Sequence, residues 1–194
     1  MTRDEVALCL ALALTASPAM AAQDQTIMPG HSTESVPTTG SPYAGMEQRV
    51  VKALSDQQIA DLKAGRGMGF ALVAELNRYP GPSHVLELAE ALQLNNEQRM
   101  KAKALVEAMK KETIPLGEQI LAEELALDRL FADGTVTPAS LQARVTRIGL
   151  EQGALRAAHL RYHLAMIEVL SSNQIHRYAQ LRGYGVTSHP GHSD

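Results

Sequence analysis

The sequence predicts an all-α protein built on a long antiparallel helical hairpin with shorter flanking helices. Apolar residues make up 45% of the 194 residues, but aromatic residues make up only 4% and Trp is absent, so the core must consist mainly of aliphatic side chains and Met. Such a composition favours helices over strands. In addition, helix-start signals recur along the chain, and two long stretches carry apolar residues at helical spacing.

Residues 1–21 have the pattern of a secretory signal peptide. Residues 6–16 form a mostly apolar run that is too short to span a bilayer, which takes about 20 residues. Ala19-Met20-Ala21 fits the small-x-small pattern of a cleavage site. The segment before the run is not net positive, which leaves a buried or membrane-associated apolar helix as the alternative. We expect cleavage after Ala21, a periplasmic location and no stable insertion in a membrane.

The two ends of the mature chain have the composition of loops. Residues 22–43 are rich in Gln, Thr, Ser, Pro and Gly without periodicity, which predicts a disordered linker. Residues 185–194 are expected to form a flexible tail that contains His189 and His192, and residues 44–184 form a single helical domain. Cys9, the only cysteine, lies in the signal segment, so the mature chain would have no disulfide and no thiolate.

Three helices in this domain are predicted to start with the same device, a capping box. The side chain of the capping residue accepts the N–H of the third helical residue, and a Gln at that position reaches back to the N–H of the cap. A leucine before each cap can pack onto the first turn as a hydrophobic staple. The three sets are Leu54, Ser55 and Gln58; Leu94, Asn95 and Gln98; and Leu170, Ser171 and Gln174.

The shorter helices precede the hairpin. The first runs from Ser55 to near residue 65, where "GRGMG" (65–69) breaks it, and the second covers about residues 70–78. The segment "YPGPS" (79–83) ends the second helix, and Ser83 is expected to cap a third that reaches about residue 93.

Two long helices form the hairpin. One runs from Asn96 to about residue 131, with Pro115 expected to kink it, and the other is capped by Thr137 with Pro138 at its first position and reaches about residue 169. The second carries an apolar seam at heptad spacing, with arginines mostly on its solvated face. The seam is Leu141, Val145, Ile148, Gln152, Leu155, His159, Tyr162, Met166 and Val169, and the facing stripe is Leu105, Met109, Leu116, Ile120, Leu127 and Leu130.

Several function classes are excluded by the sequence. A net charge of −3 gives no basic footprint for nucleic acid. The glycines of 65–69 lack the Lys-Ser/Thr of a phosphate loop, and "HLRYH" (159–163) has Leu where a zinc protease needs Glu. The adjacent Glu123 and Glu124 are expected on a solvated helix surface. No catalytic constellation is present, so we do not expect an enzyme.

The sharpest constellation is His159, His163 and Met166, which lie on one face of the second long helix. Imidazole nitrogen and thioether sulfur are ligands for zinc, copper or nickel, and a thioether favours Cu(I). His84, with Glu75 or Glu87, is a candidate for completing such a site. The alternative is a seam histidine beside a core methionine, with His163 at the edge of the core. A transition metal, zinc or copper, would be the ion bound, and no cofactor is required.

The segments "LNNEQR" and "LSSNQIHRY" resemble degenerate L-T-x-x-Q motifs of the Spy/CpxP family, a superfamily that also contains periplasmic heavy-metal-resistance proteins and sensors. The matching residues are Leu94, Asn95 and Gln98, and Leu170, Ser171 and Gln174. Both copies lack the usual Thr and Pro, although Asn and Ser cap a helix equally well. The resemblance covers about residues 46–184 and implies a cradle-like, often dimeric fold in the periplasm.

Two functions follow from these observations. The favoured one is an ATP-independent, chaperone-like envelope-stress protein that binds unfolded or stress-exposed envelope proteins, forms a homodimer and responds to metal. The alternative is a periplasmic heavy-metal-binding resistance or sensor protein that uses His159, His163 and Met166.

Overall fold

The computed structural model describes residues 40–184 of the chain. The signal segment, the linker up to residue 39 and the tail from residue 185 lie outside the described residues. Within 40–184 the chain is helical and has no strand, which confirms the all-α prediction. In chain order the elements are η1 (Met46–Gln48), α1 (Asp56–Lys63), α2 (Leu72–Glu75), α3 (Pro82–Glu87), α4 (Asn96–Ala132), α5 (Pro138–Ile167) and α6 (Ser172–Leu181).

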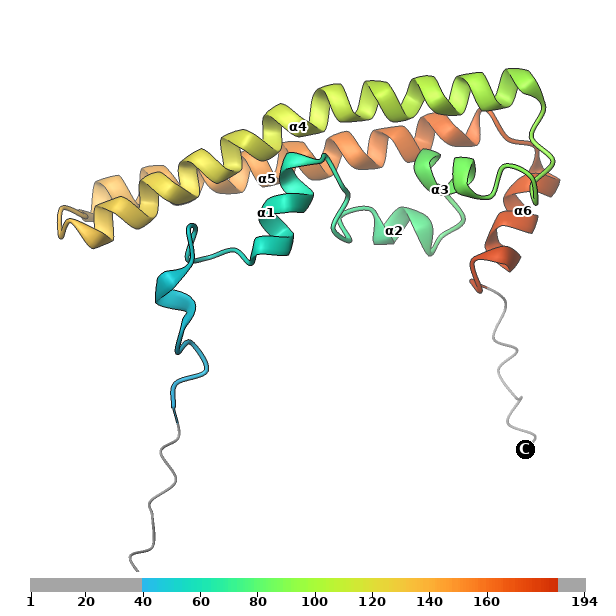
Figure 1. Ribbon diagram of the computed structural model, residues 1–194. Helices are drawn as coiled ribbons and strands as arrows, with labels where there is room; N and C mark the ends of the chain where they lie inside the picture. Colours follow the sequence, from blue (N-terminus) through green and yellow to red (C-terminus); the bar gives the residue numbers. More distant parts are fainter. Residues whose placement is uncertain (1–39, 185–194) are drawn as a thin grey trace, which may run out of the picture. The chain divides into compact units, whose positions relative to one another are not determined.

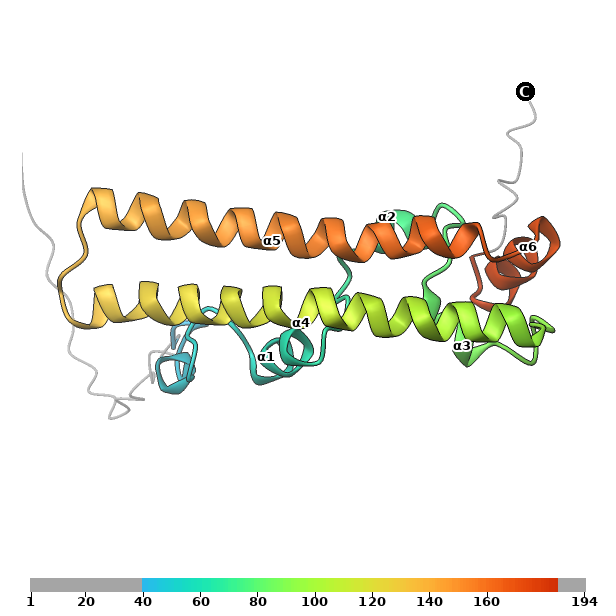
Figure 2. The ribbon, with the colours of Figure 1, turned by 90° about the horizontal axis from the view of Figure 1, so that it is seen from above.

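The long helices α4 and α5 lie antiparallel along their whole length and form the predicted hairpin (Figures 1 and 2). The short helices α1, α2 and α3 lie on one side of this pair, and α6 lies at the end away from the hairpin turn (Figure 1). Helix α4 continues through Pro115, and the hairpin bends near its middle toward the side of α1 (Figure 1). A proline inside a helix removes one hydrogen bond and commonly bends the axis, as the sequence predicted.

All three predicted capping boxes form. Ser55, Asn95 and Ser171 each accept the backbone N–H of the Gln three residues on, and each Gln side chain accepts the N–H of its cap. Thr137 also caps α5 as predicted, with Pro138 as the first helical residue.

Two of the short helices differ from the prediction. Ser83 does not cap α3, because the helix already begins at Pro82 with Gly81 as its N-cap. The fixed φ of proline suits the first helical position, so the start moves forward. Helix α3 ends at Glu87 and α2 covers only Leu72–Glu75, so both are shorter than expected.

The second and third capping boxes also bind each other. The amide of Gln98 donates to Oε1 of Gln174 at 2.8 Å, and the amide of Gln174 donates to Oε1 of Gln98 at 3.1 Å. Gln98 also donates to the carbonyl of Val169 at 3.0 Å, and Gln174 to that of Leu92 at 3.2 Å. Among residues 40–184, Gln58 of the first box has side-chain bonds to its own cap and to no other element. The repeated motif therefore fastens the start of α4 to the start of α6.

This amide pair predicts coupled stability effects. We expect Gln98→Ala and Gln174→Ala to lower the free energy of unfolding each, and the double variant to lose about 1 kcal/mol less than the sum, because either single change already breaks the shared bonds. Urea denaturation followed by circular dichroism measures all four proteins. Gln58→Ala combined with Gln174→Ala serves as the control pair and should be additive; additivity in the Gln98/Gln174 cycle as well would contradict a direct link.

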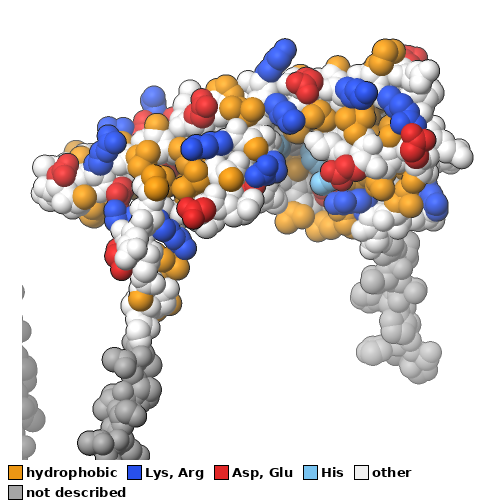
Figure 3. All heavy atoms as spheres, in the orientation of Figure 1, with side chains coloured by type: hydrophobic (Ala, Val, Ile, Leu, Met, Phe, Trp, Pro, Cys, Tyr) orange, Lys and Arg blue, Asp and Glu red, His pale blue; other side chains and the backbone are white. Residues whose placement is uncertain are grey.

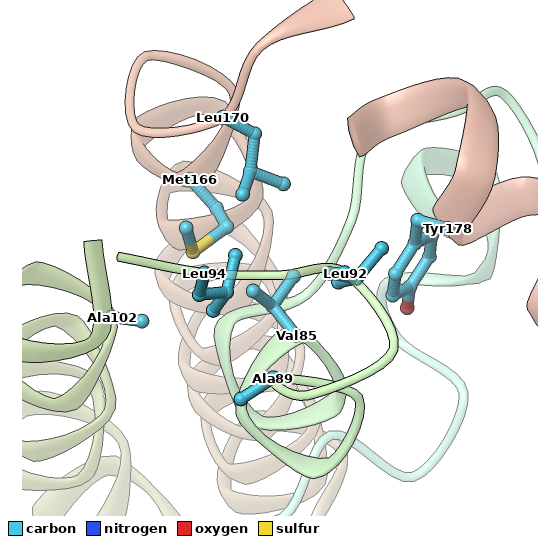
Figure 4. Close-up of a cluster of buried hydrophobic side chains, with 8 residues drawn as sticks. All are labelled: Val85, Ala89, Leu92, Leu94, Ala102, Met166, Leu170 and Tyr178. Carbon is cyan, nitrogen blue, oxygen red and sulfur yellow. The ribbon is translucent and has the colours of Figure 1, made fainter. Parts of the chain in front are cut away.

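Among residues 40–184 the core consists of two apolar clusters. The first lies where α3, α4, α5 and α6 meet, and Met166 and the staple leucines Leu94 and Leu170 are buried in it (Figure 4). Its members are Val85, Ala89, Leu92, Leu94, Ala102, Met166, Leu170 and Tyr178. The second joins α1 to the middle of the hairpin and comprises Val51, Leu62, Ile120, Leu121 and Leu155. Together they hold the short helices against one side of α4 and α5.

The predicted seam is buried only where short helices cover it. Ile148, Leu155 and His159 are buried, whereas Leu141 and Val145 are 38% and 49% exposed near the turn of the hairpin, where α1, α2 and α3 do not reach. The prediction that Glu123 lies on a solvated surface is also wrong. Its side chain is largely covered and forms an ion pair across the hairpin with Arg144 at 2.6 Å.

Candidate metal centre

A cavity of about 450 Å³ lies on the side of the hairpin that carries the short helices. The loop of residues 65–69, the segment around α2 and α3, and the C-terminal half of α5 contribute its walls. Three of the four predicted metal ligands, His84, His159 and His163, line it together with Glu75. Figure 3 shows histidine side chains in a recess of this face, below the long helices.

Met166 is not brought to this cavity. It is fully buried in the first apolar cluster, between Leu94 and Leu170 (Figure 4). The spacing of His163 and Met166 places them on one face of α5, but the Met166 side chain packs among the aliphatic residues of this cluster. Met166 is therefore a core residue, as the alternative interpretation of the sequence expected.

His163 is oriented by the backbone. Its Nδ1 lies 2.7 Å from the carbonyl oxygen of Tyr79, which can only accept a hydrogen bond. In the neutral ring, Nδ1 therefore carries the proton and Nε2 keeps its lone pair. A Cβ added at Gly81 would lie 3.1 Å from this Nε2 and 2.9 Å from Oε1 of Glu75. The imidazole nitrogen and the carboxylate thus face the same small space, which a side chain at position 81 would fill.

Glu75 is a buried carboxylate with several donors. Tyr178 donates its hydroxyl to the two carboxylate oxygens at 3.0 and 2.8 Å, and the N–H of Gly81 donates to Oε1 at 3.2 Å. Nδ1 of His84 lies 2.7 Å from the same oxygen. Burial by itself would raise the pKa of Glu75, but the bonds from His84 and Tyr178, with the nearby His163, outweigh it and hold the pKa below its ordinary value. The carboxylate is therefore charged at neutral pH.

His159 is the second buried imidazole of the site. It is 2% exposed, and among residues 40–184 its Nε2 has no hydrogen-bond partner. Burial, together with the nearby His163, lowers its pKa to about 4, so the ring is neutral at pH 7. Phe70 stacks on the ring with centroids 6.4 Å apart. A buried ring nitrogen with no protein partner is unusual, and this atom is available to bind a ligand.

The donor chemistry fits a transition metal, but the donors are not preassembled. Imidazole nitrogens and a carboxylate oxygen suit zinc, copper or nickel. Nevertheless, in the described part of the chain no three side chains of His, Cys, Asp or Glu are grouped closely enough to hold a metal ion. Glu75 and His84 bind each other, so these two side chains would have to turn before they could join His163 around an ion.

Sequence reasoning identified the histidines but not the residues that position them. Tyr79 acts through its backbone carbonyl, Gly81 through its lack of a side chain and Tyr178 through its hydroxyl. None of these roles produces a recognisable sequence motif. The available signal was the glycine in "YPGPS", which marks a close approach of backbone to other groups.

Residues 67–177 match the sequence profile of the heavy-metal-resistance family, and this match covers more than half of the chain. Neither the curated proteins nor the solved structures contain a match to the sequence. The matched segment includes His84, His159, His163 and Glu75. Members of this family are typically periplasmic, and no helix among residues 40–184 has the length and apolar character to cross a membrane. The match confirms the resemblance inferred from the sequence, and the chain belongs to the heavy-metal-resistance family, within the Spy/CpxP-like superfamily.

Proposed function

We propose that this protein is a non-enzymatic periplasmic metal-binding protein that holds a transition-metal ion in the cavity beneath the hairpin. The observation that carries the proposal is the pair of buried imidazoles, His159 and His163, which line one cavity. Among residues 40–184 the Nε2 atom of His159 has no hydrogen-bond partner, and the bond of His163 Nδ1 to Tyr79 leaves the other ring nitrogen available. Membership of the heavy-metal-resistance family supports the same conclusion. This proposal places metal binding before chaperone-like binding, which is the reverse of the order that we inferred from the sequence.

The residues of the chain have separate roles in this proposal. The carbonyl of Tyr79 fixes the tautomer of His163, and burial keeps His159 uncharged, so that one ring nitrogen can bind a metal ion. Glu75 supplies a negative charge that offsets part of the charge of a divalent cation, and His84 stands beside it as a further nitrogen donor. A bound ion would act by stabilising the folded protein or changing how α3 packs on the hairpin, because ligand binding to the native state shifts its stability.

Isothermal titration calorimetry of the mature chain with Zn(II), Ni(II) and Cu(II) tests the proposal. We expect His159→Ala/His163→Ala to weaken binding by at least about 100-fold, because even a supporting group of a metal ligand contributes about 10- to 100-fold. His176→Ala is the matched control, since His176 is exposed on α6 and bonds only to Gln180 among the described residues.

The remaining histidines need a second control. His31, His189 and His192 lie outside the described residues. If the ion binds in the cavity, a variant with all three replaced by Ala should keep the affinity of the unmodified protein. Equal affinity in the unmodified protein and in the His159/His163 variant, with binding lost in the tail variant, would overturn the proposal.

A second function, chaperone-like binding of unfolded envelope proteins, is favoured by one observation. Leu72, Val73 and Leu76 on and beside α2 are 54%, 53% and 59% exposed, and apolar side chains gather along the lower edge of this face in Figure 3. Exposed apolar patches commonly bind partners. Suppression of light scattering by an aggregating client should fall in Leu72→Ser/Leu76→Ser but not in Leu150→Ser, whose leucine is even more exposed, on α5. No loss in the α2 variant would count against it.

A further inference from the structure

Two methionine residues also line the cavity, and the pair of histidines on α5 gave no indication of them. Met68 and Met109 line it alongside His159. Met109 is buried on α4, and Met68 belongs to the loop "GRGMG", which the sequence presents only as a break between helices. The candidate metal centre described above uses nitrogen and oxygen donors, so these two sulfur atoms have no role in it.

The backbone at Met68 is in an unfavourable conformation. Its φ of 41° lies in the left-handed region, which residues with a side chain rarely adopt. Glycine would adopt it without strain, and the loop already has glycine at 65, 67 and 69. The chain nevertheless places a long thioether side chain here. Strain of this kind is concentrated at binding sites, where the surrounding structure holds it in place.

The loop is fastened against His159 and Met109. A Cβ added at Gly67 would lie 3.6 Å from Nδ1 of His159, so the backbone next to Met68 passes directly over this ring. Phe70 then stacks on the same imidazole. On the other side, the Thr113 hydroxyl lies 3.4 Å from the carbonyl of Gly65 and 2.9 Å from that of Met109, which joins the loop to the turn of α4 that carries Met109.

We propose that His159, which also belongs to the centre described above, forms with Met68 and Met109 a soft-metal subsite of the same cavity, which binds a monovalent ion, Cu(I) or Ag(I). Thioether sulfur is a soft ligand that selects Cu(I) over harder divalent ions. The three donors are uncharged when His159 is neutral, which suits an ion of charge +1 because an unneutralised divalent charge is costly to bury. The unpartnered Nε2 of His159 supplies the nitrogen.

This inference rests on the proposed metal-binding function and assigns the metal classes to different parts of one cavity. His163, Glu75 and His84 form the part with a charged carboxylate, and they serve divalent ions. His159 is shared by the two sets, because it lies against the loop of Met68 and is one helical turn from His163 on α5.

Silver ion is the probe of choice because it stays monovalent in air, and Cu(I) with a competing chelator under anaerobic conditions is the second probe. We expect Met68→Leu/Met109→Leu to bind Ag(I) at least about 100-fold more weakly while its Zn(II) affinity stays within about twofold, because Leu keeps the apolar volume but removes the sulfur. Met100→Leu is the matched control, since Met100 is exposed on α4 away from the cavity.

Two further readouts separate binding from folding. The ε-methyl NMR signals of Met68 and Met109 should shift on addition of one equivalent of Ag(I), whereas that of Met166 should not. Met68 packs against the second apolar cluster, so Met68→Leu, which keeps the apolar volume, should leave the melting temperature close to that of the unmodified protein while it weakens Ag(I) binding. Ag(I) binding that is unchanged in Met68→Leu, or that weakens only together with a loss of folding, would contradict the subsite.

The outcomes distinguish this subsite from the proposed function. If Met68→Leu/Met109→Leu binds Ag(I) as tightly as the unmodified protein, the subsite is wrong but metal binding by the histidines stands. If that variant loses Ag(I) and Zn(II) together, there is no separate subsite. If the unmodified protein binds none of these ions, the proposed function itself fails.

Discussion

Replacement of Gly117 by alanine should destabilise the protein by about 2–3 kcal/mol, although alanine normally stabilises a helix interior by about 1 kcal/mol relative to glycine. Gly117 lies on α4 where α1 crosses it. An added Cβ would lie 2.5 Å from the carbonyl oxygen and 3.0 Å from the carbonyl carbon of Leu62. Both are backbone atoms and cannot rotate away, so α1 must move off the hairpin and the second apolar cluster must open.

The same helix pair provides the control for this substitution. Gly149 and Gly153 lie on α5, and a Cβ at either would have no neighbour within 4 Å. Gly149→Ala should therefore stabilise the protein by up to about 1 kcal/mol, which is the ordinary helical preference. Urea denaturation of the three proteins measures both effects. An increase in stability for both substitutions would show that α1 does not pack on α4 as described.

The metal-free protein should lose about 3 kcal/mol of its free energy of unfolding through His159 as the pH falls from about 6.5 to about 4. The magnitude follows because each unit of pKa shift corresponds to about 1.4 kcal/mol. Burial lowers the pKa of His159 from 6.5 to about 4. Between these values the unfolded chain binds a proton at this position and the folded protein does not. The stabilisation is complete above pH 6.5 and is lost as the solution is acidified. Glu75, whose pKa is also lowered, changes stability in the same direction only at lower pH.

His159→Gln isolates this contribution because Gln is polar but does not titrate in this range. We expect the free energy of unfolding of this variant to be flatter between pH 6.5 and 4.5 than that of the unmodified protein, with both measured by urea denaturation in the presence of a chelator. His176→Gln, on the exposed face of α6, should leave the slope unchanged. A slope in His159→Gln equal to that of the unmodified protein would mean that His159 is protonated in the folded state.

The helix starts were predictable because their causes are local. The capping boxes at Ser55, Asn95 and Ser171 need only a cap and a Gln three residues later, and all three formed as predicted. The same is true of Thr137 with Pro138. Ser83 shows where local signals compete, since Pro82 started the helix before the serine could cap it.

The candidate site was predictable only in part. His159 and His163 are one helical turn apart, so the sequence places them together, and it offered His84 and Glu75 without a reason for their position. Their approach depends on Gly81, Tyr79 and Tyr178, which lie 6 to 103 residues from the groups they contact. Met166 and Met109 both fit apolar positions of a heptad pattern, which does not distinguish a sulfur in the core from one that lines a cavity.

The sequence by itself determined the helical class, the starts of the long helices and the pair of histidines on α5, because each of these depends on residues within one turn of one another. Only the tertiary structure decided which side chains surround the histidines, that Gln98 and Gln174 bind each other across 76 residues, and that Met68 rather than Met166 lies at the cavity. These outcomes depend on how short helices without strong periodicity pack against the hairpin. That packing is set by close backbone approaches, such as those at Gly81 and Gly117, which leave no periodic trace in the sequence.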